Sequence, residues 1–301
     1  MIKNVFITGG LGQDGQILTK LLDKKKLNIK VITKQISKNI KKNNFIFNDL
    51  SNKKKIDLIF SKTKPDIVLH LASNNPSFGQ KNYNLFYKKN FIATKNIFLS
   101  TFQSNINAKF IFCSSSQIFK KKNGVVNEKS KTQVTSDYTK FRINCHSLML
   151  KYKKLHKINY TNAILFNHDS KFRNKKFILP RIIEALIYKK INFLNKIIKE
   201  NISSDFSHAD DICLGLYQLM TNKDNLDKII LSSNKKTNLN DIIKYLIKKN
   251  NLDINIFDYN KKTSNCLIGN NKVAIDKLNW SPKKNIFLAA NDIYKSKLLR
   301  H

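Results

Sequence analysis

Residues 1–15, which read MIKNVFITGGLGQDG, decide the fold that this sequence predicts. Residues 5–7 form a short apolar run of the kind found in a buried strand, and apolar residues recur with helical spacing from Ile17 onward. Four of the eight glycines in the chain stand between the two patterns: Gly9, Gly10, Gly12 and Gly15. A chain with so few glycines uses them where the backbone requires them, so the stretch predicts a strand, a tight turn and a helix.

The glycines of this turn suit a loop that binds phosphate groups. Gly9 permits the sharp turn, Gly12 lets the backbone approach a pyrophosphate, and Gly15 lets the helix pack against the strand. The start of the helix then offers backbone N–H groups and a partial positive charge to an anion. An ordinary glycine-rich turn between a strand and a helix is the alternative interpretation.

The composition is globular, with a large excess of positive charge. Lys and Arg number 56 and Asp and Glu 20, a net charge of +36 in 301 residues. Such a charge would suit nucleic acid or an acidic membrane surface. However, the lysines occur in short runs along the whole chain, and aromatic residues do not interleave with them as a base-stacking surface would need. We expect no nucleic-acid partner, and a nucleic-acid-binding protein is only a distant alternative.

The sequence gives no sign of a membrane span, a signal peptide or a metal site. No apolar run approaches the roughly 18 residues of a membrane helix, and Met1 leads directly into a strand. The cysteines are too widely spaced for a zinc motif or a disulfide framework: Cys113, Cys145, Cys213 and Cys266. We expect a cytoplasmic protein with no metal and no membrane partner.

Strand-like and helix-like segments alternate through the first half of the chain, a pattern typical of a parallel sheet with helices on both faces. Further strands are expected at residues 29–32, 45–47, 65–73, 110–113 and 164–168. The predicted fold of this part is α/β, with a doubly wound, Rossmann-like parallel sheet.

The TGGLGQDG stretch resembles the cofactor loop of the extended short-chain dehydrogenases, a family that includes NAD-dependent epimerases and dehydratases. The Gln-Asp-Gly ending is most similar to the GDP-mannose 4,6-dehydratases. This resemblance implies a nicotinamide dinucleotide cofactor. It also implies that Gly9, Gly12, Gln13, Asp14 and Gly15 belong to the cofactor site.

Two later segments continue the resemblance. Asp49 and Leu50 are similar to the Asp-Leu pair that contacts adenine in the family, although Asp49 is also a plausible turn residue. Residues 65–73, PDIVLHLAS, resemble the strand that leads the chain under the cofactor, which implies that Leu71 and Ala72 are cofactor contacts. We expect His70 to be a core histidine.

The residues after the second strand favour NADP over NAD. In NAD enzymes an acidic residue at this place binds the ribose 2′-hydroxyl. This chain has Lys34 there instead, with Lys38 nearby. A cation suits the 2′-phosphate of NADP, so NADP is the expected cofactor.

Two segments carry the expected chemistry. Residues 114–119, SSSQIF, resemble a family loop in which Ser115 takes the place of the hydroxyl that binds the sugar. Tyr138 corresponds to the catalytic tyrosine, which exchanges a proton with the sugar hydroxyl while hydride moves to the cofactor. The family has a lysine four residues later, but this chain has Arg142, whose planar fork does not replace an ammonium position for position. Lys140 would lie on the wrong side of a helix.

A second departure concerns the dehydration step. The dehydratases use a glutamate as the base that takes the C5 proton, and Gln117 stands at that position. An amide has no basicity to offer. Epimerisation or ketone reduction at C4 would survive this change, whereas dehydration would need another base.

The second half resembles the substrate lobe of the dehydratases. The resemblance implies an NADP-binding domain of residues 1–165, with some later segments returning to it. It implies that residues 166–301 form mainly a smaller, mixed α/β lobe for the nucleotide-sugar substrate. Residues 162–170, NAILFNHDS, imply that Asn167 binds the nucleotide diphosphate, and residues 177–183 imply a phosphate contact from Arg181. Ser204 replaces an arginine that meets the diphosphate in the family. We expect His208 and Asp211 to hold the lobe together.

The expected function is NADP-dependent modification of a nucleotide-diphosphate sugar, with GDP-mannose favoured, by an enzyme similar to GDP-mannose 4,6-dehydratase. The enzymatic alternative is a nucleotide-sugar 4-epimerase or 4-ketoreductase. Gln117 and Arg142 together favour a third hypothesis, a catalytically silent protein that binds NADP or a nucleotide sugar. The resemblance implies a homodimer or homotetramer.

Overall fold

The computed structural model describes residues 4–33, 45–47, 50–73, 83–256 and 264–299. The chain divides into two compact units. Unit 1 comprises residues 1–120, 131–164 and 216–229, and unit 2 comprises residues 121–130, 165–215 and 230–301.

Unit 1 is organised around a seven-stranded sheet with the order β10-β7-β5-β4-β1-β2-β3. Its strands are β1 (Asn4–Thr8), β2 (Asn28–Thr33), β3 (Phe45–Phe47), β4 (Ile67–His70), β5 (Lys109–Ser115), β7 (Asn159–Leu165) and β10 (Lys228–Leu231). The pairs that join β3, β2, β1, β4 and β5 are all parallel. The chain winds outward from β1 in both directions, which confirms the doubly wound sheet and puts its switch point between β1 and β4.

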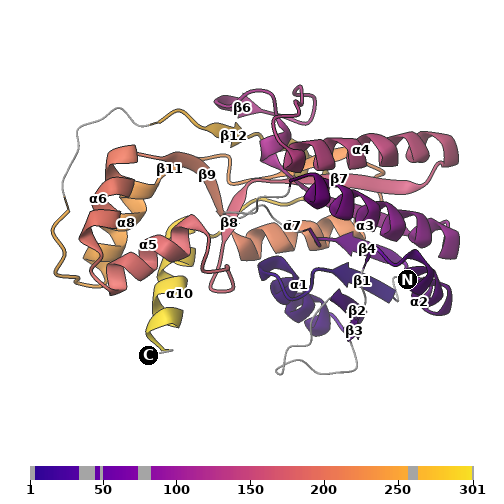
Figure 1. The fold of residues 1–301 in the computed structure, drawn as a ribbon, viewed down its shortest axis with the longest axis horizontal. Helices are drawn as coiled ribbons and strands as arrows, with labels where there is room; N and C mark the ends of the chain where they lie inside the picture. The colour runs from indigo at the N-terminus through magenta and orange to yellow at the C-terminus, as the bar shows by residue number, and fades with distance from the viewer. Residues whose placement is uncertain (1–3, 34–44, 48–49, 74–82, 257–263, 300–301) are drawn as a thin grey trace. The chain divides into compact units, whose positions relative to one another are not determined.

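Helices cover both faces of this sheet (Figure 1). The helices α2 (Lys53–Thr63), α3 (Tyr83–Ser104) and α4 (Asp137–His156) pack side by side on one face, and α1 (Gln13–Lys24) lies on the other. Successive residues of a strand point to opposite faces. In β1, therefore, Phe6 joins the core under α2 to α4, while Val5 and Ile7, also fully buried, face the other side.

Aromatic rings fill the core between the sheet and α2 to α4. The ring of Phe98 on α3 meets Phe110 of β5 at 5.2 Å and Tyr160 of β7 at 6.1 Å, both edge to face. The ring of Tyr152 on α4 lies 5.7 Å from Phe98 in the same geometry. Edge-to-face pairs add roughly 0.5–1.5 kcal/mol each beyond the burial of their area, so this core holds α3 and α4 firmly on the sheet.

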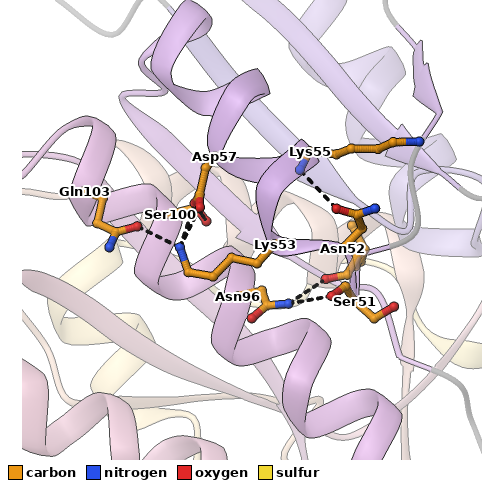
Figure 2. Close-up of polar contacts among 9 residues, drawn as sticks. Ser51, Asn52, Lys53, Lys55, Asp57, Asn96, Ser100 and Gln103 are labelled. Atoms are coloured by element: carbon orange, nitrogen blue, oxygen red, sulfur yellow. Dashed lines mark hydrogen bonds and ion pairs between the residues drawn. The ribbon is translucent and has the colours of Figure 1, made fainter.

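A polar network joins the exposed side of α2 to α3 (Figure 2). Lys53 and Asp57 form an ion pair of 2.7 Å one turn apart on α2. From α3, Ser100 donates to a carboxylate oxygen of Asp57 at 2.5 Å, and Lys53 donates to Gln103 at 3.0 Å. Next to this pair, the Asn96 amide donates to the backbone carbonyl of Ser51 at 2.9 Å. These contacts fix the entry to α2, which follows a segment predicted to bind the cofactor.

Unit 2 is the mixed lobe that the sequence predicts. A three-stranded sheet has the order β11-β9-β8, in which β8 and β9 are parallel and β9 and β11 antiparallel. Its strands are β8 (Asn167–Asp169), β9 (Ser203–His208) and β11 (Lys236–Asn238); β6 (Gly124–Val126) pairs separately with β12 (Leu267–Gly269). The helices that begin in or belong to this unit are α5 (Ile178–Ile187), α6 (Ile191–Glu200), α7 (Ala209–Thr221), α8 (Leu239–Lys249), α9 (Lys272–Leu278) and α10 (Ile286–Leu298). The apolar faces of α5, α6, α8 and α10 form its main core.

Asp211 holds the segment that leads into α10, residues 280–284, against α7. Its carboxylate accepts hydrogen bonds from the backbone N–H groups of Lys283, at 2.8 Å, and Lys284, at 2.6 Å. Its backbone carbonyl accepts one from the indole of Trp280 at 2.8 Å. The backbone N–H of Asp210 donates to Nδ1 of His208 at 3.1 Å. Asp211 and His208 therefore make the structural contacts expected of them.

One strand expected from the sequence differs in the structure. The strand predicted at residues 164–168 is wrong in its extent, because β7 ends at Leu165 and β8 begins at Asn167. β7 belongs to the seven-stranded sheet and β8 pairs with β9, so tertiary pairing divides one apolar run between two sheets.

Across the described ranges, no helix has the length and apolar character needed to cross a membrane.

Candidate active site

The glycine loop connects β1 to α1 in a tight turn. Gly9 has a φ of +75°, and a Cβ there would lie 2.9 Å from the backbone nitrogen of Ala72. Gly15 lies against the loop, where a Cβ would be 2.3 Å from the Cα of Gly10. A Cβ on Gly12 would meet only the carbonyl oxygen of Gly9, at 3.2 Å. Gly9 thus has the backbone conformation predicted for the turn, Gly15 packs on the loop and not on the strand as predicted, and Gly12 leaves space beside the start of α1.

The loop also requires a glycine at position 10, for which the sequence analysis gave no reason. A Cβ at this position would lie 2.0 Å from a methyl carbon of Val31 on β2. Close packing of the loop on the neighbouring strand therefore needs a glycine here. The adjacent glycines could have indicated a close contact, but not the partner.

A buried histidine holds the strand ends beneath this loop. Nδ1 of His70 lies 2.8 Å from the hydroxyl of Thr8, and Nε2 lies 2.8 Å from the hydroxyl of Thr94 on α3. The Thr8 oxygen also accepts a hydrogen bond from the backbone N–H of Ala72 at 3.1 Å. The tautomer that uses the Thr8 hydroxyl proton has a bare Nδ1 and a proton on Nε2. His70 is the satisfied core histidine that was predicted.

The other predicted cofactor residues of unit 1 lie in different environments. Gln13 is buried in the first turn of α1 and donates to the carboxylate of Asp14 at 3.2 Å. The side chain of Leu50 belongs to the core under α2 to α4, and Leu71 and Ala72 follow β4 half-buried. Lys34 and Asp49 lie outside the described residues.

The start of α4 holds the candidate catalytic tyrosine. Ser136 caps the helix, accepting from the backbone N–H of Thr139 at 3.2 Å, while Thr139 accepts in return from the N–H of Ser136 at 2.9 Å. This capping box fixes the first turn, on which Tyr138 is 8% exposed. Lys140 points elsewhere, with its ammonium 5.0 Å from the ring of Tyr87, as expected from its position on the helix.

Arg142 lies one turn after Tyr138 and points into unit 1. It is 6% exposed, and its Cζ lies 5.0 Å from the ring centroid of Tyr138. One terminal nitrogen donates to the backbone carbonyl of Cys113 on β5, and the other donates to the hydroxyl of Ser73 at 2.8 Å. The guanidinium therefore ties α4 to the ends of β4 and β5, and both terminal nitrogens already have partners in the protein.

The serine loop leaves the end of β5. Ser115 caps a short 3₁₀ helix, η2 (Ser116–Ile118), by accepting from the backbone N–H of Gln117 at 3.3 Å. Gln117 is exposed, and its neighbour Ser115 is half-buried. The hydroxyl of Ser114 is buried and has no hydrogen-bond partner in the structure. Because the Ser115 oxygen only accepts in the capping hydrogen bond, its hydroxyl proton remains available as a donor.

Cys113 shows that the glycine loop and the tyrosine helix meet at the end of β5. Burial is the main cause that raises the pKa of its thiol, and the nearby carboxylate of Asp14 raises that pKa further. The guanidinium of Arg142 acts in the opposite direction and lowers it. The contacts agree with this: Arg142 donates to the carbonyl of Cys113 and to the hydroxyl of Ser73, and Gly9 of the loop packs on the adjacent Ala72. The carboxyl edge of the parallel strands, where ligands bind in doubly wound sheets, therefore gathers residues from α1 and α4.

These residues fit a dinucleotide at the loop and less well at the tyrosine. The turn at Gly9, the space beside Gly12 and the start of α1 form the cradle that a pyrophosphate requires. The terminal nitrogens of Arg142, by contrast, already donate to the carbonyl of Cys113 and the hydroxyl of Ser73. Among the described ranges, no group of three or more His, Cys, Asp or Glu side chains could hold a metal ion.

Unit 2 contains a pocket of about 370 Å³, a size within the roughly 300–1,000 Å³ typical of ligand sites. Its polar lining consists of Asn167, Asp169, Arg173, Ser203 and Ser204. Its apolar lining consists of Phe177, Ile178, Ile202, Phe206 and Leu239. A lining with one polar part and one apolar part suits a ligand with a charged group and a flat apolar group.

The pocket includes one of the two predicted substrate residues. Asn167 is exposed, and its amide donates to the hydroxyl of Ser204 at 2.6 Å. Arg181 does not line this pocket; it is exposed on α5, and its guanidinium lies 5.0 Å from the ring of Phe193 on α6.

Arg173 is the pocket residue that sequence reasoning missed. Its Nε lies 2.8 Å from a carboxylate oxygen of Asp169, and its Cζ lies 3.6 Å from the ring centroid of Phe177. The only signal in the sequence was the spacing of an acid, a guanidinium and an aromatic residue at successive four-residue intervals. The residues between them form turns, so a helical pattern could not have found it.

Comparison with known proteins gives consistent matches. The family model described as "NAD dependent epimerase/dehydratase family" matches residues 5–232. GDP-6-deoxy-D-talose 4-dehydrogenase of Aggregatibacter actinomycetemcomitans is 26% identical over 72% of this chain and 70% of its own length. GDP-mannose 4,6 dehydratase 1 of Arabidopsis thaliana is 24% identical over 78% of this chain and 72% of its own. Among solved structures, the UDP-glucose 4-epimerase of Thermotoga maritima has a TM-score of 0.83 at 18% identity, covering 98% of this chain and 99% of that one.

Proposed function

We propose a function from the premise that this chain belongs to the NAD dependent epimerase/dehydratase family, whose model matches most of it. The proposal is an NADP-dependent enzyme that modifies a nucleotide-diphosphate sugar at C4, in the manner of a GDP-mannose 4,6-dehydratase. Unit 1 would bind the cofactor and unit 2 the nucleotide part of the substrate. The relatives named for GDP-sugars support this substrate class, and the solved epimerase with UDP-glucose makes UDP-sugars the next class to test.

One observation carries the proposal: the glycine loop packs on Ala72, where a Cβ on Gly9 would lie 2.9 Å from the backbone nitrogen, and Arg142 of the tyrosine helix donates to the hydroxyl of the next residue, Ser73, at 2.8 Å. A dinucleotide enzyme of this kind needs a pyrophosphate cradle and an acid–base group at the same sheet edge. In this chain the glycine loop and the start of α4 contact neighbouring residues after β4.

The chain's own residues would divide the work as follows. Gly9, Gly12 and the start of α1 would hold the pyrophosphate, and Lys34 would favour the 2′-phosphate of NADP. Tyr138 would take the proton of the sugar hydroxyl at C4 and return it. The hydroxyl of Ser115, held at the end of β5, would orient that sugar hydroxyl. When bound, the nicotinamide would accept and return the hydride.

Arg142 would act on Tyr138 through its charge and not through its donors. Its guanidinium lies 5.0 Å from the tyrosine ring, while its terminal nitrogens are engaged by Cys113 and Ser73. A fixed positive charge close to the ring would attract the negative charge that develops on the tyrosine oxygen during proton transfer. The ribose contact that a lysine makes in the family would be lost.

Gln117 limits the reaction that the site can complete. An amide cannot take a proton from C5, so oxidation and reduction at C4 need only Tyr138 and Ser115, whereas dehydration needs a further base. A 4-epimerase or 4-ketoreductase is therefore the second candidate. The engaged donors of Arg142 favour a third candidate, a silent protein that binds the cofactor or the nucleotide sugar.

The test is incubation of the purified protein with NADP and GDP-mannose, followed by mass spectrometry for a 4-keto-6-deoxy product. Q117E, which supplies the missing carboxylate, is assayed in parallel. We expect Q117E to form more product than the wild type. Y138F is the control: we expect it to abolish turnover and to keep NADP binding, because the substitution removes only the hydroxyl.

Each result distinguishes among the candidates. Product from the wild type supports the dehydratase and requires another C5 base. Product from Q117E alone identifies a protein with the dehydratase fold that has lost the dehydration step. A changed configuration at C4 of the sugar identifies an epimerase. NADP binding with no turnover in any variant supports the silent protein, and failure to bind NADP or NAD overturns the proposal.

A further inference from the structure

We propose that Ser73 is a positioning residue, whose hydroxyl holds the guanidinium of Arg142 beside the ring of Tyr138. This inference rests on the proposed function, because it takes Tyr138 as the acid–base group. It goes further by giving a role to a residue outside the glycine loop, the serine loop and the tyrosine helix. The sequence analysis assigned nothing to Ser73, which is the last residue of the PDIVLHLAS stretch.

The buried guanidinium of Arg142 depends on neutral hydrogen-bond acceptors. Arg142 is 6% exposed, and no described carboxylate forms an ion pair with it. Its Nε is buried and has no hydrogen-bond partner among the described residues. One terminal nitrogen donates to the backbone carbonyl of Cys113, and the other donates to the hydroxyl of Ser73 at 2.8 Å. A buried charged group that loses an acceptor carries a desolvation cost, so each contact restricts where the guanidinium can lie.

The aromatic rings around the guanidinium do not fix its orientation. Its Cζ lies 5.0 Å from the ring centroid of Tyr138, 5.1 Å from that of Phe141 and 5.4 Å from that of Phe112. Attraction between a cation and a ring acts at distances up to about 6 Å, so three rings hold the charge in this region without selecting one of them. Hydrogen bonds are directional, and two bonds to separate terminal nitrogens fix the plane of the guanidinium.

The two acceptors differ in what a substitution can change. The carbonyl of Cys113 belongs to the backbone of β5, and no side-chain substitution removes it. The hydroxyl of Ser73 comes from the segment after β4, next to Ala72, on whose backbone nitrogen Gly9 of the glycine loop packs. Ser73 is therefore the contact that links this segment to the tyrosine helix, and the one through which the position of Arg142 can be altered.

Loss of the Ser73 hydroxyl would leave one terminal nitrogen of Arg142 buried without its acceptor. The guanidinium would then turn about its side-chain bonds toward another acceptor, and its charge would leave its present place beside Tyr138. A charge stabilises the negative charge that develops on a tyrosine oxygen only while it is held in position. We therefore expect S73A to act on Tyr138 through Arg142.

The first experiment is NMR of the full chain with isotope-labelled arginine side-chain nitrogens and tyrosine Cζ carbons. The chain has four arginines, so R142K identifies the signals of Arg142, and Y138F identifies the signal of Tyr138. Two engaged terminal nitrogens slow rotation about the Nε–Cζ bond of Arg142. We expect S73A to speed this rotation by about tenfold or more, the effect of losing one hydrogen bond to a charged group, and to shift the Tyr138 signal. S73T keeps the hydroxyl and should keep the slow rotation.

S147A is the matched control, because Ser147 lies on the same helix as Arg142 and is exposed. It also removes a serine hydroxyl, and we expect it to leave the rotation of Arg142 and the signal of Tyr138 unchanged. NADPH titration of every variant reports on correct folding of unit 1. If S73T misfolds, the comparison of S73A with S147A decides the question alone.

The second experiment is turnover of the same variants with NADP and GDP-mannose. We expect S73A to lower kcat by about tenfold and to change KM by less than about twofold, because the contact with Arg142 acts on the transition state and not on substrate binding. S73T should restore kcat. A general structural defect would instead lower NADPH binding together with kcat.

The outcomes separate this inference from the function on which it rests. Fast rotation of Arg142 in the wild type overturns the inference, as does rotation that S73A leaves unchanged or a Tyr138 signal that S73A does not move. Equal losses of kcat in S73A and a folded S73T also overturn it. Rotation released in S73A, with a shifted Tyr138 signal and no turnover in any variant, supports the inference and excludes only the enzymatic function.

Discussion

At the scale of single residues, His70 shows how burial controls a charge. Burial and the nearby Arg142 lower the pKa of His70 to about 3, whereas an unfolded histidine titrates near 6.5. Between these values the unfolded state binds the additional proton, so His70 makes the protein less stable as the pH falls below about 6.5. The expected loss is about 1.4 kcal/mol for each pH unit until the folded pKa is reached.

The prediction concerns the variant H70Q. At pH 7 it should be less stable than the wild type, because it disturbs the contacts with Thr8 and Thr94. Between pH 7 and 5 its free energy of unfolding, measured in urea, should fall less steeply than that of the wild type. H156Q, which removes an exposed histidine of α4, should keep the wild-type slope. Parallel slopes for H70Q and the wild type would show that His70 does not cause this pH dependence.

At the scale of elements, the docking of α1 depends on a glycine that faces backbone. A Cβ at Gly15 would lie 2.3 Å from the Cα of Gly10, and backbone atoms cannot move aside as a flexible side chain can. Alanine has the higher helix propensity by about 1 kcal/mol, so propensity alone predicts that G15A is stabilising. Overpacking typically costs about 1–3 kcal/mol, and we expect the steric term to dominate.

The measurement is thermal unfolding of G15A and G12A without nucleotide. G15A should be less stable than the wild type by up to about 2 kcal/mol, the balance of those two terms. G12A is the matched control, because its Cβ would meet only one carbonyl oxygen, at 3.2 Å. It should be destabilised less than G15A while weakening NADP binding. A stabilised G15A would refute the close packing of α1 on the loop.

At the scale of the whole molecule, the net charge of +36 opposes folding through self-repulsion. Salt screens charges over a Debye length of about 10 Å at 0.1 M. We therefore expect the melting temperature to rise between about 20 and 300 mM NaCl. If screening recovers about 1 kcal/mol, the rise is roughly 2–4 °C. Sucrose at matched osmolarity separates screening from a general solute effect, and an unchanged or falling melting temperature in NaCl would contradict the prediction.

Much of the fold could be predicted because its signals are local. The glycine loop, the apolar run of β1 and the helical pattern of α1 lie within about 20 residues, and each depends on backbone conformation more than on distant partners. The start of α4 was predictable for the same reason, since Ser136 and Thr139 cap it from within the segment. The parallel, doubly wound character of the sheet followed from the alternation of strands with helices.

The candidate site could be predicted only in part. Tyr138 and Arg142 were identified by position, but the partners of Arg142 were not, because Ser73 lies 69 residues away in the sequence and Cys113 lies 29 away. The pocket posed the same problem, since Arg173 lies in turns with no periodic pattern. Nothing in the local sequence distinguishes an arginine that lines a cavity from one that stacks on a helix, as Arg181 does.

The sequence by itself determined the doubly wound sheet, the glycine turn between β1 and α1, and the family to which the chain belongs. The steric properties of glycine and the spacing of apolar residues are sufficient to predict these features. Both act over short distances along the chain, so the features persist when the rest of the sequence changes. Only the tertiary structure decided that Arg142 ties strand ends together, that residues 159–169 divide between two sheets, and that Arg173 is the guanidinium of the pocket. These features depend on which distant side chains pack together, and a side chain's partners are set by the packing of the whole unit.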